Sequence, residues 1–125
     1  MACRITELVL DCADPDKLAD FWCGVLGYQV LDRDPEGIEI GRADQAPEDR
    51  ITLILSRSDE PKAGKLRLHI DVNATDRDQA RELERLFAAG ARTADVGQTG
   101  AESWHVLADP EGNEFCLLRR RVPEV

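Results

Sequence analysis

The sequence predicts an α+β fold made of two βαβββ modules in tandem. Together they would form a curved, mainly antiparallel sheet around a cleft, with the helices on its convex face. Short β-branched segments and two amphipathic helical segments follow the order strand–helix–three strands twice, so that the second half of the chain can be aligned with the first. The 125 residues fit a single domain. We expect module one at residues 1–57, a linker at 58–65 and module two at 66–125.

The first module begins with a β-branched, partly alternating strand at Ile5–Cys12. A helix should follow, because Asp14 can cap its N-terminus and Pro15 suits its first position, while Gly27 can end it. The apolar residues between them, which include Phe21 and Trp22, recur at helical spacing and should enter the core. Three further strands are predicted at Tyr28–Arg33, Gly37–Arg42 and Arg50–Ser56.

The second module repeats this order after a polar linker. Leu66–Val72 alternates between apolar and polar residues and predicts a strand. Thr75 or Asp76 is expected to cap a helix that ends near Gly90. Three further strands are predicted at Arg92–Val96, Ser103–Ala108 and Glu114–Arg120.

The repeat is visible as two slightly different offsets between the halves. The shift that places Leu8 on Ile70 aligns the first strands, whereas the shift that places Gly27 on Gly90 is longer by a single position and aligns the last strands. An additional residue in the second helix would explain the change. Residue identity between the halves is low, so the repeated apolar and capping pattern is the evidence for an internal duplication.

Composition narrows the function classes. The net charge of −9 argues against a nucleic-acid partner, since phosphate binding needs a basic face, and Arg119–Arg121 is read as a solvated strand end. No apolar run reaches the roughly 20 residues of a membrane span, and the N-terminus lacks the pattern of a signal peptide. The four cysteines lack zinc-finger spacing and are expected to be free thiols. We therefore expect a cytoplasmic protein.

Strand alternation predicts which side chains enter the cleft. In the second module, Arg67, His69 and Asp71 should face it, opposite the apolar residues of the same strand. The offsets place Glu7 opposite His69 and Leu53 opposite Cys116, and these four positions should converge. Carboxylate, imidazole and thiolate groups are competent ligands for zinc and similar ions, whereas leucine is not.

Two motifs carry a resemblance to a known family. The segment from Asp14 to Trp22 followed by Leu26-Gly27-Tyr28, and the segment from Asp109 to Phe115, are similar to signatures of the vicinal oxygen chelate superfamily, which includes glyoxalases, bleomycin-resistance proteins and dioxygenases. Glyoxalase-like domains are the most similar members. The resemblance covers nearly the whole chain. It implies a small-molecule ligand in the cleft and, together with the exposed strand edges, a homodimer.

The resemblance also implies where a metal would bind. Metal-dependent members supply one ligand from the first strand and one from the last strand of each module. In this sequence those positions hold Glu7, Leu53, His69 and Cys116. Glu7, His69 and Cys116 are therefore the candidate ligands of zinc, nickel, manganese or iron, although Cys116 also suits a small core residue.

Two functions remain open from the sequence. In the first, the protein is a lyase, isomerase or dioxygenase in which Glu7 and His69 hold a metal or act as base and acid. In the second, it sequesters a ligand without metal or chemistry, as bleomycin-resistance proteins do. Leu53 favours the second function and the Glu7–His69 pairing favours the first. In both, the candidate substrate-binding residues are Asp71, Arg67, Leu53 and Trp104.

Overall fold

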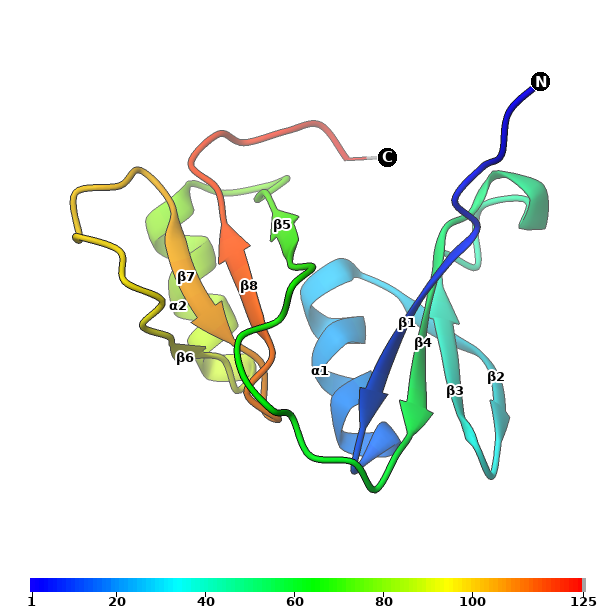
Figure 1. Ribbon diagram of the computed structural model, residues 1–125. Helices are drawn as coiled ribbons and strands as arrows, with labels where there is room; N and C mark the ends of the chain where they lie inside the picture. The colour runs from blue at the N-terminus through cyan, green and yellow to red at the C-terminus, as the bar shows by residue number, and fades with distance from the viewer. Residues whose placement is uncertain (125) are drawn as a thin grey trace. The chain divides into compact units, whose positions relative to one another are not determined.

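The computed structural model describes residues 1–124 and divides into two compact units, Met1–Pro61 and Lys62 onward. The division lies within the polar segment that the sequence suggests as a linker. Each unit is a four-stranded mixed sheet with one α-helix (Figure 1). The predicted α+β class and the duplicated order of strand, helix and three strands are therefore confirmed.

The first unit has the strand order β1-β4-β3-β2, in which β1 and β4 are parallel and the other neighbours antiparallel. Its elements are β1 (Glu7–Cys12), α1 (Pro15–Leu26), β2 (Gln29–Asp34), β3 (Gly37–Gly41), the 3-10 helix η1 (Pro47–Asp49) and β4 (Thr52–Arg57). The parallel pairing of the first and last strands requires a crossover, which α1 begins.

The signals that begin and end α1 act as the sequence predicts. The Asp14 carboxylate accepts a hydrogen bond from the Lys17 backbone N–H at 3.1 Å, and Pro15 occupies the first turn. The helix ends at Gly27, whose φ of 67° is left-handed and favours glycine. The apolar side of α1 is buried against β3 and β4, and the first unit's core consists of Leu18, Phe21, Trp22, Ile38, Ile40, Leu53 and Leu55.

The second unit repeats this topology with shorter strands. Its order is β5-β8-β7-β6, with β5 and β8 parallel. Its elements are β5 (Ile70–Val72), α2 (Gln79–Ala89), β6 (Arg92–Thr93), β7 (His105–Ala108) and β8 (Glu114–Leu117). The strand predicted at Arg92–Val96 is shorter in the structure and ends at Thr93. Beyond it, the Gln98 side chain forms hydrogen bonds with the backbone: its Oε1 accepts from Val96 N at 2.8 Å and its Nε2 donates to Ala94 O at 2.6 Å.

The strand predicted over Leu66–Val72 is wrong in its first half, because β5 covers only Ile70–Val72. β8 begins at Glu114, and the Leu66 backbone N–H donates to the Glu114 side chain at 3.0 Å instead of to a neighbouring strand. Leu68 is 71% exposed, so it does not join the apolar side of the sheet. The alternating pattern of this segment therefore overstates the length of the strand.

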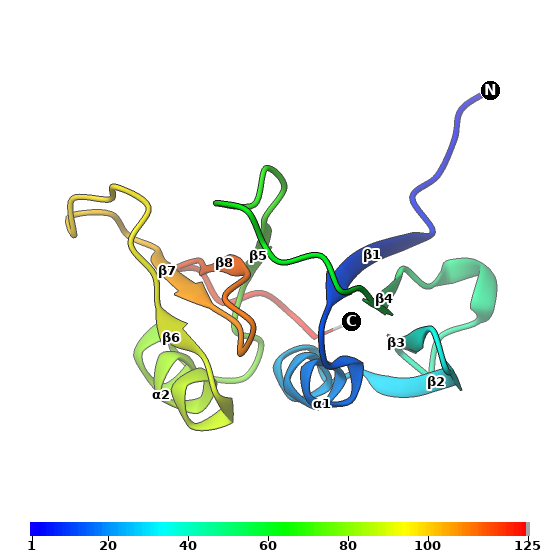
Figure 2. The same ribbon diagram turned by 60° about the horizontal axis from the view of Figure 1, so that its bottom comes forward.

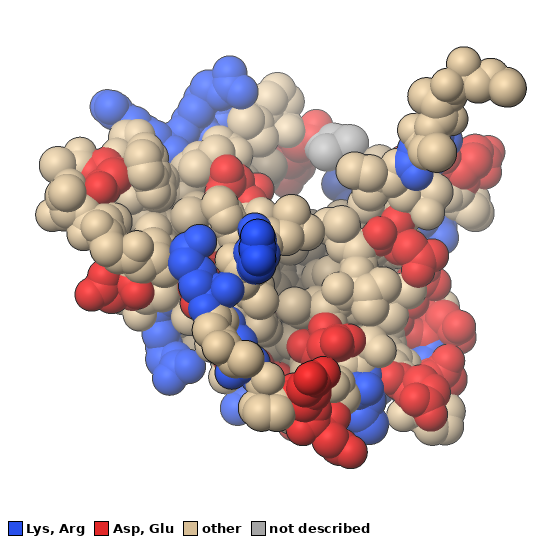
Figure 3. Space-filling view, viewed as in Figure 1, with Lys and Arg blue, Asp and Glu red and all other residues tan. Residues whose placement is uncertain are grey.

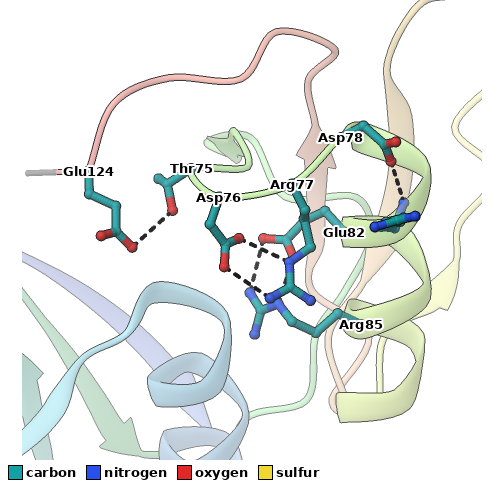
Figure 4. A network of polar contacts seen from close by, with 8 residues as sticks. Thr75, Asp76, Arg77, Asp78, Glu82, Arg85 and Glu124 are labelled. Carbon is teal, nitrogen blue, oxygen red and sulfur yellow. Dashed lines mark hydrogen bonds and ion pairs between the residues drawn. The ribbon is translucent and has the colours of Figure 1, made fainter.

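The N-cap of α2 is Asp78, and neither Thr75 nor Asp76 caps the helix. Asp78 accepts a hydrogen bond from the Arg81 backbone N–H at 2.9 Å. Asp76 instead forms an ion pair with Arg77, and the Thr75 hydroxyl donates to Glu124 (Figure 4). The side chains of both predicted caps are thus used in other contacts before the helix begins.

A buried carboxylate stabilises the first turns of α2. Glu82 is 7% exposed, and its two oxygens accept from Arg85 Nε at 2.6 Å and Nη2 at 3.0 Å. Arg77 Nε lies 3.9 Å from the same carboxylate (Figure 4). Two guanidinium groups therefore compensate the cost of burying this charge.

Each sheet has one face covered by the helix of its own unit (Figure 2), and we call the opposite side the open face. In β1, Leu8 and Leu10 are part-buried on the helix side, whereas Glu7, Val9 and Asp11 are exposed on the open face. In β5, Asp71 alternates in the same way with part-buried neighbours. The alternation of side chains in a strand thus places polar groups on the open face of both sheets.

Charge is distributed unevenly between the two units. Residues 1–61 hold 14 acidic and 6 basic residues, a formal charge of −8, whereas residues 62–125 hold 11 acidic and 10 basic residues, a formal charge of −1. Figure 3 shows both acidic and basic side chains on the visible surface. Within residues 1–124, neither helix combines the length and apolar composition that crossing a bilayer requires.

Candidate functional site

Three side chains of different chemistry meet on the open face of the second sheet. His69 directly precedes β5, Asp71 lies within β5, and Cys116 lies in β8. One ligand atom from each residue lies within 4.8 Å of the other two. His69 Nε2 is 3.1 Å from Asp71 Oδ1. We refer to these residues as the His69–Asp71–Cys116 cluster.

The backbone of the sheet fixes this arrangement. Asp71 and Cys116 are direct partners in the parallel pairing of β5 with β8, so their side chains leave the sheet on the same face. The turn before β8 is held by Asp109, whose buried carboxylate accepts hydrogen bonds from the backbone N–H groups of Glu111 and Asn113 at 2.9 Å each. Two segments far apart in the sequence therefore present Asp71 and Cys116 together.

The three groups differ in their access to solvent. The side chains of His69 and Asp71 are 43% and 46% exposed, whereas Cys116 is buried. Burial raises the pKa of the Cys116 thiol, and the charge of Asp71 and a hydrogen bond to it raise this pKa further, with Lys65 acting in the opposite direction. At neutral pH the thiol is therefore protonated, and the exposed imidazole and carboxylate are the groups that a ligand can reach.

In the first unit, the residue equivalent to Cys116 is not the one that the sequence suggests. β1 pairs Leu8 with Leu53, as β5 pairs Ile70 with Phe115, so the residue equivalent to Cys116 is Ile54. The longer of the two predicted offsets is therefore wrong for this strand by a single position, and such a shift reverses the face of the sheet.

The remaining candidates are Leu53 and Glu7 in the first unit and Arg67 and Trp104 in the second. Leu53 is 3% exposed in the core under α1, so the prediction that it faces a ligand is wrong. Glu7 is exposed at the start of β1, in the first unit. In the second unit, Arg67 is exposed in the segment before β5, and Trp104, which is 44% exposed, directly precedes β7. Of the predicted site residues, His69, Asp71 and Cys116 are the ones that the structure brings together.

Sequence reasoning missed Glu114, which fixes the segment leading to His69. This side chain accepts a hydrogen bond from Leu66 N at 3.0 Å and from Lys62 Nζ at 2.9 Å. Burial by itself would raise the pKa of Glu114, but the hydrogen bonds from Leu66 and Lys62 outweigh it and lower the pKa. No local signal reveals this anchor, since its partners lie far earlier in the chain.

We expect Glu114→Gln to reduce the free energy of unfolding by about 1–2 kcal/mol at neutral pH, because the charge-assisted hydrogen bonds are lost. The pKa of Glu114 is lower in the folded than in the unfolded chain, so its stabilisation is complete above the ordinary glutamate pKa of 4.5 and disappears as the pH falls through the folded value. Urea titrations at pH 7 and at pH 3.5 measure the difference. Glu84→Gln, at an exposed position of α2, is the control. An equal effect of the two variants at pH 7 would contradict the anchoring role.

Comparison with known proteins identifies a family over most of the chain. Residues 7–118 match the family model of the glyoxalase-like domain. A comparison of the sequence with curated proteins finds no significant match. Both motifs that carry the resemblance in the sequence lie within the matched residues.

Solved structures with the same fold cover nearly the whole chain. Fosfomycin resistance protein FosX from Listeria monocytogenes is 13% identical with a TM-score of 0.71, over 98% of this chain and 94% of that one. A glyoxalase/bleomycin resistance protein/dioxygenase family enzyme from Burkholderia phytofirmans PsJN is 16% identical with a TM-score of 0.66, over 92% and 97%. Leishmania major glyoxalase I is 14% identical with a TM-score of 0.62, over 94% and 87%. At these identities the likeness establishes the fold.

Proposed function

Since this chain belongs to the glyoxalase-like domain family, we propose that it binds a small organic molecule on the open face of its second sheet and acts on it through His69. The His69–Asp71–Cys116 cluster is the observation that carries this proposal. The cluster combines an exposed imidazole with a carboxylate that orients it, on a face that its own helix leaves uncovered. Arg67 and Trp104, which lie in the same unit, are proposed as further contacts to the ligand.

The contact between His69 and Asp71 assigns a role to each imidazole nitrogen. In the neutral ring, Nε2–H donates to Asp71 Oδ1 at 3.1 Å, which leaves Nδ1 as the unprotonated acceptor. Nδ1 can then take a proton from a bound substrate and return it in a later step, while Asp71 stabilises the imidazolium that forms. In this proposal His69 is the catalytic base and acid, and Asp71 is a positioning residue.

Sequestration of a ligand without chemistry is the second candidate function. It is favoured by the first unit, where the positions equivalent to Asp71 and Cys116 are the aliphatic Val9 and Ile54. Val9 is 60% exposed, so the open face of the first sheet offers apolar surface to a ligand. Among the structural neighbours, antibiotic resistance is named for FosX.

A thermal-shift screen of small organic molecules, including 2-oxoaldehydes, thiol adducts and catechols, will identify ligands. We expect His69→Ala to weaken the binding of a hit about 10- to 100-fold, the cost of a lost hydrogen bond to a charged group. His105→Ala is the matched control, because this second histidine is exposed on β7 and paired with Leu117 on the helix side. Equal effects of the two variants would contradict the proposal.

Turnover separates the two candidate functions. If His69 is the base and acid, His69→Ala lowers kcat by about 10²- to 10⁴-fold for any hit that the protein converts. If mass spectrometry over hours detects no product from any tight ligand, sequestration is favoured instead.

A further inference from the structure

We propose that the small molecule bound at the His69–Asp71–Cys116 cluster is an organic anion, whose carboxylate or phosphate group is held by Lys65 and Arg67. This inference rests on the proposed function for the location of the site and goes beyond it in naming the chemical class of the ligand. The two cations lie in the segment of the second unit that leads into β5, directly before His69 and on alternate positions with it.

One carboxylate fixes the segment that carries the two cations. Glu114 accepts a hydrogen bond from the Leu66 backbone N–H at 3.0 Å. Leu66 stands between Lys65 and Arg67 in the chain, so this bond holds the backbone beside both. Glu114 and Cys116 alternate in β8, and the Glu114 side chain therefore leaves the sheet on the open face. The segment accordingly lies on the open-face side of the second sheet, opposite α2 (Figure 2).

Lys65 also acts on the cluster electrostatically. Burial and the charge of Asp71 raise the pKa of the Cys116 thiol, whereas the charge of Lys65 lowers it. Basic side chains gather over the segment that leads into β5 on the visible surface (Figure 3). A negative group bound at this segment would therefore lie beside the cluster.

The carboxylates of the site do not use the two cations. Glu114 contacts Lys62 at 2.9 Å, and Asp71 contacts His69 at 3.1 Å. Both cations are exposed, and in the part of the chain that the structure describes, residues 1–124, neither forms an ion pair. The chain holds 25 acidic and 16 basic residues, so carboxylate partners are abundant elsewhere. Two positive charges therefore remain beside the site for a negative group of a ligand.

The duplication shows that the fold does not require cations at these positions. The shift that places Leu8 on Ile70, which the strand pairing of both units supports, also places the neutral Cys3 and Ile5 on the two cations. β1 still forms after these neutral residues. Positive charge before the first strand is therefore a feature of the second unit, where the candidate site lies.

The arrangement also predicts how the ligand is oriented. The exposed carboxylate of Asp71 repels an anion, so the anionic group should lie at Lys65 and Arg67, with the rest of the molecule extending toward His69. A guanidinium can bind two oxygens of a carboxylate or phosphate with parallel hydrogen bonds, whereas an ammonium acts as a point charge. Arg67 should therefore fix the direction of the ligand, and Lys65 should add affinity.

Four phenyl compounds with different head groups test the ligand class. Benzoate and phenyl phosphate are anions, benzamide is neutral and benzylamine is a cation. Binding to the full chain is followed by the amide chemical shifts of residues 65–72. We expect both anions to bind about 10-fold more tightly than benzamide, and benzylamine to bind most weakly, because hydrogen bonds between charged groups are the stronger ones. The tighter of the two anions identifies the preferred head group.

Salt provides a second measurement of the same preference. Raising the ionic strength from about 0.01 M to about 1 M shortens the Debye length from about 30 Å to about 3 Å. The affinity for benzoate should then fall to that for benzamide, whose own affinity should not change. A preference for benzoate that is unaffected by salt would contradict binding by the exposed cations.

Substitutions locate the anionic group. Lys65→Met and Arg67→Met each remove one charge and keep an unbranched side chain, and each should weaken benzoate binding about 10-fold without changing benzamide binding. Lys17→Met and Arg81→Met, at exposed positions of α1 and α2, are the matched controls and should change neither. Equal effects of the four variants, equal affinities for benzoate and benzamide, or no binding of either anion at millimolar concentration would overturn the inference.

The anion site and the proposed function can fail separately. If ligands from the screen depend on His69 but not on the charge of their head group, Lys65 or Arg67, the inference is overturned and the proposed function stands. If anions bind through Lys65 and Arg67 while His69→Ala changes neither binding nor turnover, the proposed function fails and the anion site stands.

Discussion

Replacement of Trp22 by alanine is expected to lower the free energy of unfolding by about 4 kcal/mol. Trp22 is 1% exposed beneath the first sheet, and its ring packs edge-on against Phe21 with 5.3 Å between centroids. Truncation removes both the burial of a large apolar surface and an aromatic pair, and it leaves a cavity that the surrounding core fills only in part. Urea unfolding followed by circular dichroism measures the loss.

The second tryptophan provides the matched control. Trp104 is 44% exposed, so Trp104→Ala should reduce the free energy of unfolding by less than about 1 kcal/mol. Where Trp22→Ala does not fold, Trp22→Phe should still show a loss of about 2 kcal/mol. Similar losses from both alanine variants would contradict the assignment of Trp22 to the core.

Asp109→Ala should destabilise the protein by about 3 kcal/mol, the second-largest effect that we expect. This carboxylate is fully buried and accepts hydrogen bonds from the backbone N–H groups of Glu111 and Asn113 and from the Asn113 side chain. Alanine would leave these buried donors without an acceptor, at about 1–3 kcal/mol for each unsatisfied group. The turn leads into β8, so the loss should also weaken the pairing that presents Cys116.

The turn between β2 and β3 supplies a control with the same local sequence. Asp34-Pro35-Glu36-Gly37 repeats the residues of Asp109-Pro110-Glu111-Gly112, and Asp34 likewise accepts from backbone N–H groups of its turn. Asp34 is exposed, so water can replace the lost acceptor, and Asp34→Ala should cost about 1 kcal/mol or less. Equal losses in urea titrations of the two variants would show that burial does not set the cost.

The features that local chemistry determines could be predicted from the sequence. The α1 boundaries follow from a capping aspartate, a proline in the first turn and a glycine at the end, all within one short segment. Trp22 and Phe21 are expected in the core from helical spacing alone, which is confirmed. Strand alternation likewise places Asp71 on the face opposite the apolar residues of β5.

Features that depend on distant residues could not be predicted. β5 is shorter than its alternating pattern suggests, because Leu66 bonds to the side chain of Glu114. The α2 cap is Asp78, because the side chains of the two predicted caps, Thr75 and Asp76, contact Glu124 and Arg77 instead. Composition and periodicity contain neither interaction.

The candidate site could be predicted in part. Alternation identifies His69 and Asp71, and the repeat offset together with the family resemblance identifies Cys116 as a candidate, but the meeting of all three depends on the register of β5 with β8. The same dependence explains the error at Leu53. In a repeat of low identity, the sequence does not show whether the offset is longer or shorter by a single position. That position decides whether the core residue Leu53 or Ile54 on the open face is aligned with Cys116.

The most direct test of the central claim is an amide chemical-shift map of the protein titrated with the tightest ligand from the screen. We predict that the largest changes fall on residues 69–72 and 114–117, and that His69→Ala removes them while His105→Ala does not. Changes confined to α2, β6 or the surroundings of His105, with residues 69–72 unaffected, would contradict a site at the His69–Asp71–Cys116 cluster.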